Sequence, residues 1–265
     1  MIHTNLAHRV NAIQNTAEVI AQSLKEMIYE AELKPGQPLI QERIAEMFQV
    51  SRVPVRDALQ MLIGMGIAIS VPRRGVIVRP LSHKLLDDQF EVRKILEGSA
   101  IRMVLRNATP ELPRRLRELI RQQSGCLKTE DIKRYGKLDE EFHQAEFEMA
   151  GNLRLVELIR SNWEMIKQAR SASIVMPEHG KMWMATSIKR HRRILAALMK
   201  RDEEIAHSII LENIESSKRE ILACLRGLGW LETTNRREGR PGRVHSTSSF
   251  SGEASQDPPR NGSIG

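Results

Sequence analysis

Three side chains of this sequence could together bind a metal ion. Asp139 and His143 are four residues apart, one turn along the same face of a predicted helix. Carboxylate oxygens and imidazole nitrogens are both ligands for divalent ions. His191 lies on a later predicted helix, and ligands from separate helices can converge in the core of a bundle. A second interpretation stays open, because an Asp-x-x-x-His pair is common and a histidine beside apolar residues is typical of a hydrogen-bonded core residue.

A second group of side chains could bind nucleic acid. Arg52 and Arg56 are four residues apart, on one face of a predicted helix that begins at Ser51. Arginine can donate two hydrogen bonds to guanine, a contact worth about 1–3 kcal/mol in base discrimination. Ser51 and the free amides at the helix start could bind a phosphate, and Arg73 and Arg74 lie in a turn that could contact phosphates or the minor groove. Alternatively, the helix arginines only expose their charges to solvent on this face, and Arg56 pairs with a nearby acid.

The arginines need a helix–turn–helix to position them. Apolar residues recur at helical spacing in three segments, and two short β-rich segments follow, joined by an Arg-Gly turn. Thr16 is the expected N-cap of the first helix, and residues 1–15 are expected to form an N-terminal arm. The pattern predicts a winged helix-turn-helix DNA-binding domain over 16–80. Its helices are expected over 16–31, 41–48 and 51–64, and its two-stranded wing over 67–71 and 76–78.

Beyond Pro80 the pattern changes to successive amphipathic helices without a convincing strand, as far as about Gly227. The connections between them are short, which predicts an antiparallel all-α bundle over 84–230 and a mostly α fold for the chain. From Thr233 onward Ser, Gly, Pro and Arg dominate, so a disordered tail is expected over 233–265. The last three helices are expected over 153–172, 182–199 and 202–225.

Composition limits the class of protein. The 265 residues carry a formal net charge of +8, and the sequence pI near 9.8 fits a partner with phosphates. Two cysteines, Cys126 and Cys224, predict reduced thiols rather than a disulfide framework or a cysteine-based zinc site. No signal peptide or membrane span is apparent, which predicts a cytoplasmic protein. Because HExxH, P-loop, dinucleotide and Ser/His/Asp patterns are also missing from the sequence, we expect no enzyme.

The N-terminal motifs resemble those of the GntR family of bacterial regulators. They are Leu33-Lys34-Pro35-Gly36, Ile44-Ala45-Glu46, Ser51-Arg52-Val53-Pro54-Val55-Arg56-Asp57-Ala58-Leu59 and Pro72-Arg73-Arg74-Gly75. The resemblance implies that Arg52 and Arg56 read an operator and that Arg74-Gly75 lies at the minor groove. Gln49 stands where Gly is usual, and Val53 replaces a common Thr. Val53 therefore lacks a hydroxyl contact, and operator preference is expected to differ.

The C-terminal segment resembles the FCD ligand domain of the FadR-like branch of that family. The residues that carry the likeness are Val92-Arg93 with Leu96-Glu97, Leu138-Asp139-Glu140-Glu141-Phe142-His143, Gly151-Asn152-Leu153-Arg154-Leu155 and His191-Arg192-Arg193-Ile194-Leu195. Many members of the branch bind a divalent metal through one Asp and three His, and the ion helps to hold a small carboxylate effector. The resemblance places Asp139, His143 and His191 on three ligand positions and Asn213 on the fourth.

Asn213 departs from the family's pattern, which has His at this position. An amide oxygen is a weaker ligand than imidazole for zinc or nickel but suits harder ions. Asn213 shares a face with apolar residues and should point inward, whereas His207 lies on a different face. A divalent Zn, Ni or Mn ion is therefore expected, with a metal-free pocket as the alternative. Arg93 is the candidate for the effector carboxylate, although an ion pair with Glu97 explains it equally well.

Together these features predict a DNA-binding repressor controlled by a small organic acid and acting as a homodimer on a near-palindromic operator. Two other classes remain as alternatives. One is an architectural DNA-binding protein without an effector, which would bind with a steep salt dependence and no sequence preference. The other is a metal-dependent enzyme that carries a DNA-docking domain.

Overall fold

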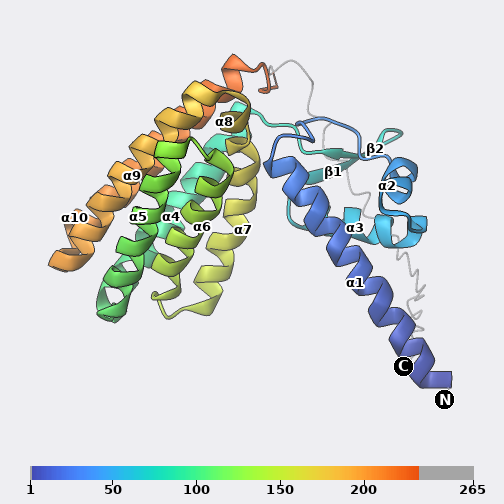
Figure 1. The fold of residues 1–265 in the computed structure, drawn as a ribbon, viewed down its shortest axis with the longest axis horizontal. Coiled ribbons are helices and arrows are strands. Elements are labelled where there is room, and N and C mark those ends of the chain that lie inside the picture. The colour runs from blue at the N-terminus through green and yellow to red at the C-terminus, as the bar shows by residue number, and fades with distance from the viewer. Residues whose placement is uncertain (1, 233–265) are drawn as a thin grey trace, which may run out of the picture. The chain divides into compact units, whose positions relative to one another are not determined.

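The computed structural model describes the backbone of residues 2–232 and the side chains of residues 15–232. The N-terminal domain holds three helices and a two-stranded antiparallel sheet (Figure 1). The sheet pairs Ala68 with Val78 and Val71 with Gly75. The predicted winged helix-turn-helix and the mostly α fold are both confirmed. Its elements are α1 (Ile2–Tyr29), α2 (Gln41–Phe48), α3 (Arg52–Gly64), β1 (Ala68–Val71) and β2 (Gly75–Val78).

The first helix begins earlier than expected. We expected it to start after Thr16 and residues 1–15 to form an arm, but α1 is helical from Ile2. The stretch from Ile2 to Tyr29 contains neither proline nor glycine, so no residue in it interrupts a helix once formed. The other end of α1 carries the buried Ile20, Leu24 and Ile28, which belong to one core with residues of α3.

The second domain is a bundle of helices (Figure 1). From 84 to 227 the structure contains no strand, as the sequence predicts. Among the packed pairs are α4 with α10, α5 with α6, and α9 with both α5 and α10. The helix expected over 153–172 is present as α7, which ends at Arg170, and the short α8 follows it. The helices are α4 (His83–Asn107), α5 (Glu111–Thr129), α6 (Ile132–Glu148), α7 (Leu153–Arg170), α8 (Ala172–Val175), α9 (Pro177–Lys200) and α10 (Glu203–Gly227).

Local chemistry fixes the starts of several bundle helices. At four of them a short polar side chain accepts a hydrogen bond from a backbone N–H in the first turn, which satisfies one of the amides a helix start leaves unpaired. Such a cap is worth about 1 kcal/mol. One of these caps fixes the start of α6, which carries two residues of the candidate site. The capping residues are Ser82, Asp131, Asn152 and Asp202.

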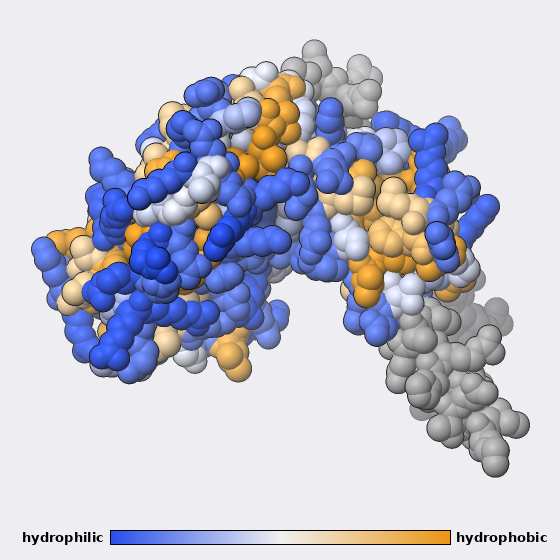
Figure 2. All heavy atoms as spheres, in the orientation of Figure 1, coloured by the Kyte–Doolittle hydropathy of each residue, from blue (hydrophilic) through white to orange (hydrophobic). Residues whose placement is uncertain are grey.

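The bundle turns its apolar residues inward, and on the face drawn in Figure 2 hydrophilic side chains cover most of its helices. Polar contacts also join α1 to the bundle. The Tyr29 hydroxyl donates to Glu164 on α7, and Lys133 on α6 pairs with Glu30 at 2.6 Å. Within the described residues, no helix is both long and apolar enough to cross a membrane. The predicted tail over 233–265 lies outside the described residues.

Candidate metal centre and nucleic-acid interface

The structure brings Asp139, His143 and His191 together in the bundle. Helix α6 carries Asp139 and His143 one turn apart, and α9 presents His191. One ligand atom from each lies within 4.8 Å of the others. The two Nε2 atoms of the histidines are 3.3 Å apart, and His191 Nε2 is 3.5 Å from an oxygen of Asp139.

A buried glutamine fixes which nitrogen of His191 carries its proton. Gln123 donates through its amide nitrogen to the backbone oxygen of Leu138 at 3.0 Å. Its amide oxygen therefore faces His191 Nδ1, at 2.8 Å, and accepts a hydrogen bond from it. The His191 Nε2 atom is then left with its lone pair directed at His143 and Asp139. A ligating histidine typically donates its other N–H in this way.

His143 has a similar support from its own helix. Its Nδ1 lies 3.2 Å from a carboxyl oxygen of Glu146, which is completely buried. Burial, together with the nearby Glu97 carboxylate, raises the pKa of Glu146 well above its usual range. Burial lowers the pKa of His143 well below its usual range and that of His191 to about 4. Both imidazoles are therefore neutral at pH 7, the state in which they can bind a metal.

Asp139 remains ionised although it is buried. Burial raises its pKa, but the Arg170 guanidinium and the two histidines more than offset this, and the pKa falls to about 2. One carboxylate oxygen accepts from Arg170 Nη1 at 2.8 Å. The other accepts from the Ser187 hydroxyl at 3.0 Å and faces His191. Asp139 thus offers a charged oxygen on the side of the histidines.

Asn213 has an amide that is buried without a hydrogen-bond partner. Within the described residues, neither its Oδ1 nor its Nδ2 finds one. Most buried polar groups are paired, so such an orphan calls for an explanation such as a bound ion. Ser217, one turn along the same helix, accepts from Arg170 Nη2 at 2.8 Å. The face of α10 that bears Asn213 therefore borders the residues around Asp139.

These donors fit a divalent ion. They combine one carboxylate oxygen with two neutral imidazole nitrogens, a ligand set that zinc and related ions accept. Metal–nitrogen bonds of about 2.0–2.1 Å in a tetrahedral site put neighbouring ligands about 3.3 Å apart. The separations of His191 Nε2 from His143 and from Asp139, 3.3 Å and 3.5 Å, match that spacing.

Two other polar residues of the bundle are not part of the three-residue cluster. Arg93 is buried and paired with Glu97 at 2.6 Å, so the ion pair that the sequence left as an alternative is present. Its Nη1 atom nevertheless has no partner among the described residues. His207 is half-buried beside Gly98 on α4, where its ring would touch an added side-chain carbon. It is less exposed than a surface histidine.

The predicted reading residues lie at the start of α3. Ser51 occupies the N-cap position, but its hydroxyl caps no backbone amide. Arg52 and Arg56 are exposed, with side-chain exposed fractions of 69% and 64%. Arg52 pairs with Glu42 of α2 at 2.9 Å, and Val53 is half exposed. An exposed pair of this kind is worth about 0–1 kcal/mol, so Arg52 can readily exchange Glu42 for a base.

The wing ends in a basic turn. Arg73 and Arg74 are exposed between β1 and β2, and the exposed Gly75 begins β2. The turn closes with a hydrogen bond from the Arg74 amide to Val71, and Arg73 has the left-handed φ of 63°. A side chain in that region costs of order 1–2 kcal/mol, which glycine would avoid. The backbone conformation thus gives up some stability while presenting an arginine at the tip.

Sequence reasoning missed four residues that support the metal-binding cluster. Glu146 and Ser187 share helices and helical spacing with His143 and His191, whereas Gln123 and Arg170 come from helices that carry no cluster residue. Gln123 gives a different signal, as a polar residue on the buried stripe of an amphipathic segment. The missed residues are Gln123 of α5, Glu146 of α6, Arg170 of α7 and Ser187 of α9.

Comparison with known proteins identifies both halves of the chain. Residues 16–78 match the model of bacterial regulatory proteins of the gntR family, and residues 88–216 match the FCD domain. The Nta operon transcriptional regulator of Aminobacter aminovorans is 29% identical over 198 residues, which cover 73% of this chain and 89% of the relative.

Two solved structures share the fold. McbR/YncC of E. coli superposes with a TM-score of 0.66 at 22% identity, over 78% of this chain and 97% of that one. The crystal structure of a GntR transcriptional regulator from Rhodococcus sp. RHA1 gives a TM-score of 0.64 at 25% identity, with the same coverage of 78% and 97%.

Proposed function

The chain belongs to the GntR family of bacterial transcriptional regulators with an FCD domain, and from this premise we propose that a small organic acid bound in its helical domain controls its affinity for an operator. The observation that carries the proposal is the buried cluster of Asp139, His143 and His191 in that domain. Such a cluster costs free energy unless it is paired, and a ligand site is a reason to keep one.

A divalent cation is the proposed bridge between the protein and the acid. Asp139, His143 and His191 would hold it, and the partnerless amide of Asn213 would add a fourth oxygen. When bound, the ion supplies a Lewis-acid position for a carboxylate oxygen of the effector. Gln123 directs the lone pair of His191 inward, and Arg170 keeps Asp139 ionised.

The winged helix is proposed to read the operator through α3. Arg52 and Arg56 would donate to guanine edges in the major groove, with Ser51 on a phosphate. Arg73 and Arg74 of the wing would contact the neighbouring backbone or minor groove. One such module buries little DNA surface, so we propose a homodimer on two half-sites of a near-palindromic operator. A dimer seated on a promoter excludes polymerase, which makes repression the simplest outcome.

The experiment that tests this function begins with selection of bound sequences from a random DNA library. Operator affinity is then measured by fluorescence anisotropy, with and without Zn²⁺ and a panel of small organic acids. We expect a near-palindromic consensus and a change in affinity of about 5–150-fold with the correct acid, the usual range of allosteric coupling. Selection that yields no consensus, with affinity set by salt alone, would instead indicate an architectural protein.

A further inference from the structure

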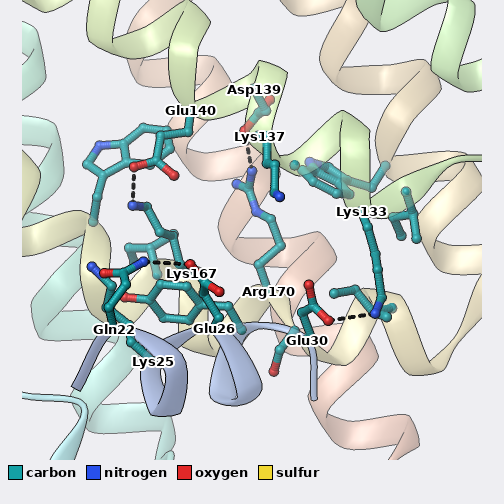
Figure 3. Close-up of a pocket in the computed structure, with 18 residues that line it drawn as sticks. Gln22, Lys25, Glu26, Glu30, Lys133, Lys137, Asp139, Glu140, Lys167 and Arg170 are labelled. Atoms are coloured by element: carbon teal, nitrogen blue, oxygen red, sulfur yellow. Dashed lines mark hydrogen bonds and ion pairs between the residues drawn. The ribbon is translucent and has the colours of Figure 1, made fainter. Parts of the chain in front are cut away.

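A pocket of about 290 Å³ lies where α1 meets α6 and α7, with Trp183 of α9 at its wall. Half of the residues that line it and are drawn in Figure 3 are charged, and the lining comes from α1 and from the bundle. Gln22, Lys25 and Glu26 belong to α1, whereas Lys137 and Arg170 belong to the bundle. The volume is at the lower end of the range for small-molecule sites, which suits a metabolite of a few carbon atoms.

Two N–H donors in the wall of this pocket have no acceptor within the part of the chain that the structure describes. Arg170 uses Nη1 on Asp139 and Nη2 on Ser217, but its Nε is buried without a partner in the described chain. The same holds for Nε1 of Trp183, whose side chain is 95% buried. The guanidinium lies 4.6 Å from the centre of the indole ring. Unsatisfied buried donors are costly, and an anionic acceptor between them would remove that cost.

The rest of the pocket carries a small excess of cationic side chains. Its lining holds five cationic side chains and four carboxylates. Three of the carboxylates are already paired, Glu30 with Lys133, Glu140 with Lys167 and Asp139 with Arg170. Lys137 is exposed and forms no ion pair with any residue that the structure describes. Figure 3 shows Lys137 and Arg170 extending into the same part of the pocket.

We propose that this pocket binds a small organic acid with two anionic groups. One carboxylate would accept from Arg170 Nε and Trp183 Nε1, and the other would lie by Lys137 and Lys133. The inference deepens the proposed function, because it rests on an acid effector and gives that effector a place between the two domains. The site differs from the three-residue cluster, with which it shares Asp139 alone.

The position of the pocket gives the acid a direct route to the DNA-binding domain. Three polar contacts hold the end of α1 against the bundle: Tyr29 with Glu164, Lys25 with Glu164, and Glu30 with Lys133. An outer carboxylate competes with Glu30 for Lys133, since both are anions within reach of one ammonium. Binding therefore changes how α1 is held, and α1 shares its core with the reading helix α3.

The test is isothermal titration of the chelator-stripped, full-length protein with malonate, succinate and glutarate. The protein is stripped of metal so that no ion bound by Asp139, His143 and His191 can bind the diacid. Succinamide, which has the shape of succinate without its charges, serves as the ligand control. We expect at least one diacid to bind saturably with one site per chain, and succinamide not to bind.

Three variants locate the site. Trp183→Phe removes the partnerless N–H and keeps an aromatic ring, and Lys137→Met removes an unpaired charge. Each should weaken diacid binding by about tenfold, the effect of one charge-assisted hydrogen bond or close charge. Lys189→Met is the matched control, an exposed lysine of α9 that also lacks an ion pair among the described residues and does not line the pocket. It should bind like the wild type.

The proposal is overturned if no diacid binds metal-free protein, if succinamide binds equally well, or if both pocket variants bind like Lys189→Met. Circular dichroism of Trp183→Phe checks its fold, and Lys137→Met decides the matter alone should that variant not fold. The titration contains no DNA, so it is independent of operator binding. If the protein binds a diacid but no operator can be found, the regulatory function is refuted and the pocket proposal stands. If an acid controls operator binding but neither variant alters its effect, the pocket proposal is refuted and the regulatory function stands.

Discussion

The Nε2 atoms of His143 and His191 face one another at 3.3 Å, from two different helices of the bundle. Each ring has its other nitrogen held by a buried side chain, Glu146 for His143 and Gln123 for His191. Asp139 completes the group from the turn before His143. The two Nε2 atoms are thus directed at a shared point beside Asp139 rather than at separate partners.

Metal ions should stabilise the protein, and His143→Ala should abolish the effect. A ligand at a hundredfold over its dissociation constant adds about 2.7 kcal/mol to the free energy of unfolding. Thermal melts of chelator-stripped protein with Zn²⁺, Ni²⁺ or Mn²⁺ should therefore shift upward by several degrees. His83→Ala, at an exposed histidine on the first residue of α4, should keep the shift. Equal shifts in both variants would place the bound ion elsewhere.

Asn213→His should strengthen the binding of zinc and nickel by about tenfold or more, because imidazole is the better ligand for both. The amide of Asn213 has no partner among the described residues, and its face of α10 borders the residues around Asp139. Competition with a fluorescent chelator measures the dissociation constant, and Glu215→His, further along α10, is the control. An affinity unchanged by Asn213→His would mean that this side chain does not reach the ion.

Gln123→Leu should weaken metal binding while every proposed ligand stays in place. The substitution removes the acceptor of the His191 Nδ1 proton, and loss of such an outer partner typically costs about 10–100-fold in metal affinity. The same chelator competition measures it. Gln122→Leu, at the neighbouring and less buried glutamine, should leave the affinity unchanged. If both variants bind alike, the orientation of His191 does not depend on Gln123.

Arg52→Ala and Arg56→Ala should each cost about 1–3 kcal/mol in operator binding and relax the preference at one base pair. Arg73→Ala should instead weaken binding to all sequences and lower the salt dependence by about one phosphate contact. Fluorescence anisotropy against the selected operator and a scrambled duplex separates the two effects. Arg154→Ala, at an exposed arginine of α7, should change neither. Wild-type affinity in both α3 variants would show that another segment reads the bases.

The protein should lose stability as the pH falls from about 6.5 to about 4. Burial holds the pKa of His191 at about 4 and that of His143 below its usual range, whereas both are near 6.5 in the unfolded chain. In that window the unfolded chain takes up protons that the folded chain does not, so the free energy of unfolding decreases with decreasing pH. Urea denaturation at several pH values measures the slope. His191→Asn should flatten it, and an unchanged slope would assign the acid sensitivity to other groups.

The sequence predicted the winged helix, the all-helical second domain and most helix bounds, because apolar periodicity and capping residues are local signals. It placed the start of α1 wrongly, since a helix without proline or glycine can continue past an apparent cap at Thr16. The sequence also predicted part of the cluster from a local signal, because Asp139 and His143 lie on one helix face. Arg170 and Gln123 were not predicted, because only the packing of α5 and α7 against α6 and α9 brings them to Asp139 and His191.

The two oxygens of Asp139 face different neighbours, one Ser187 and His191, the other Arg170 in the wall of the pocket. A cation beside His191 and an acid beside Arg170 would therefore act on opposite ends of a single carboxylate. Linkage requires that whatever the cation does to the affinity for the acid, the acid does equally to the affinity for the cation. If the coupling is favourable, the cation and the acid each bind at full affinity only when the other is present, so the protein responds to the two ligands together.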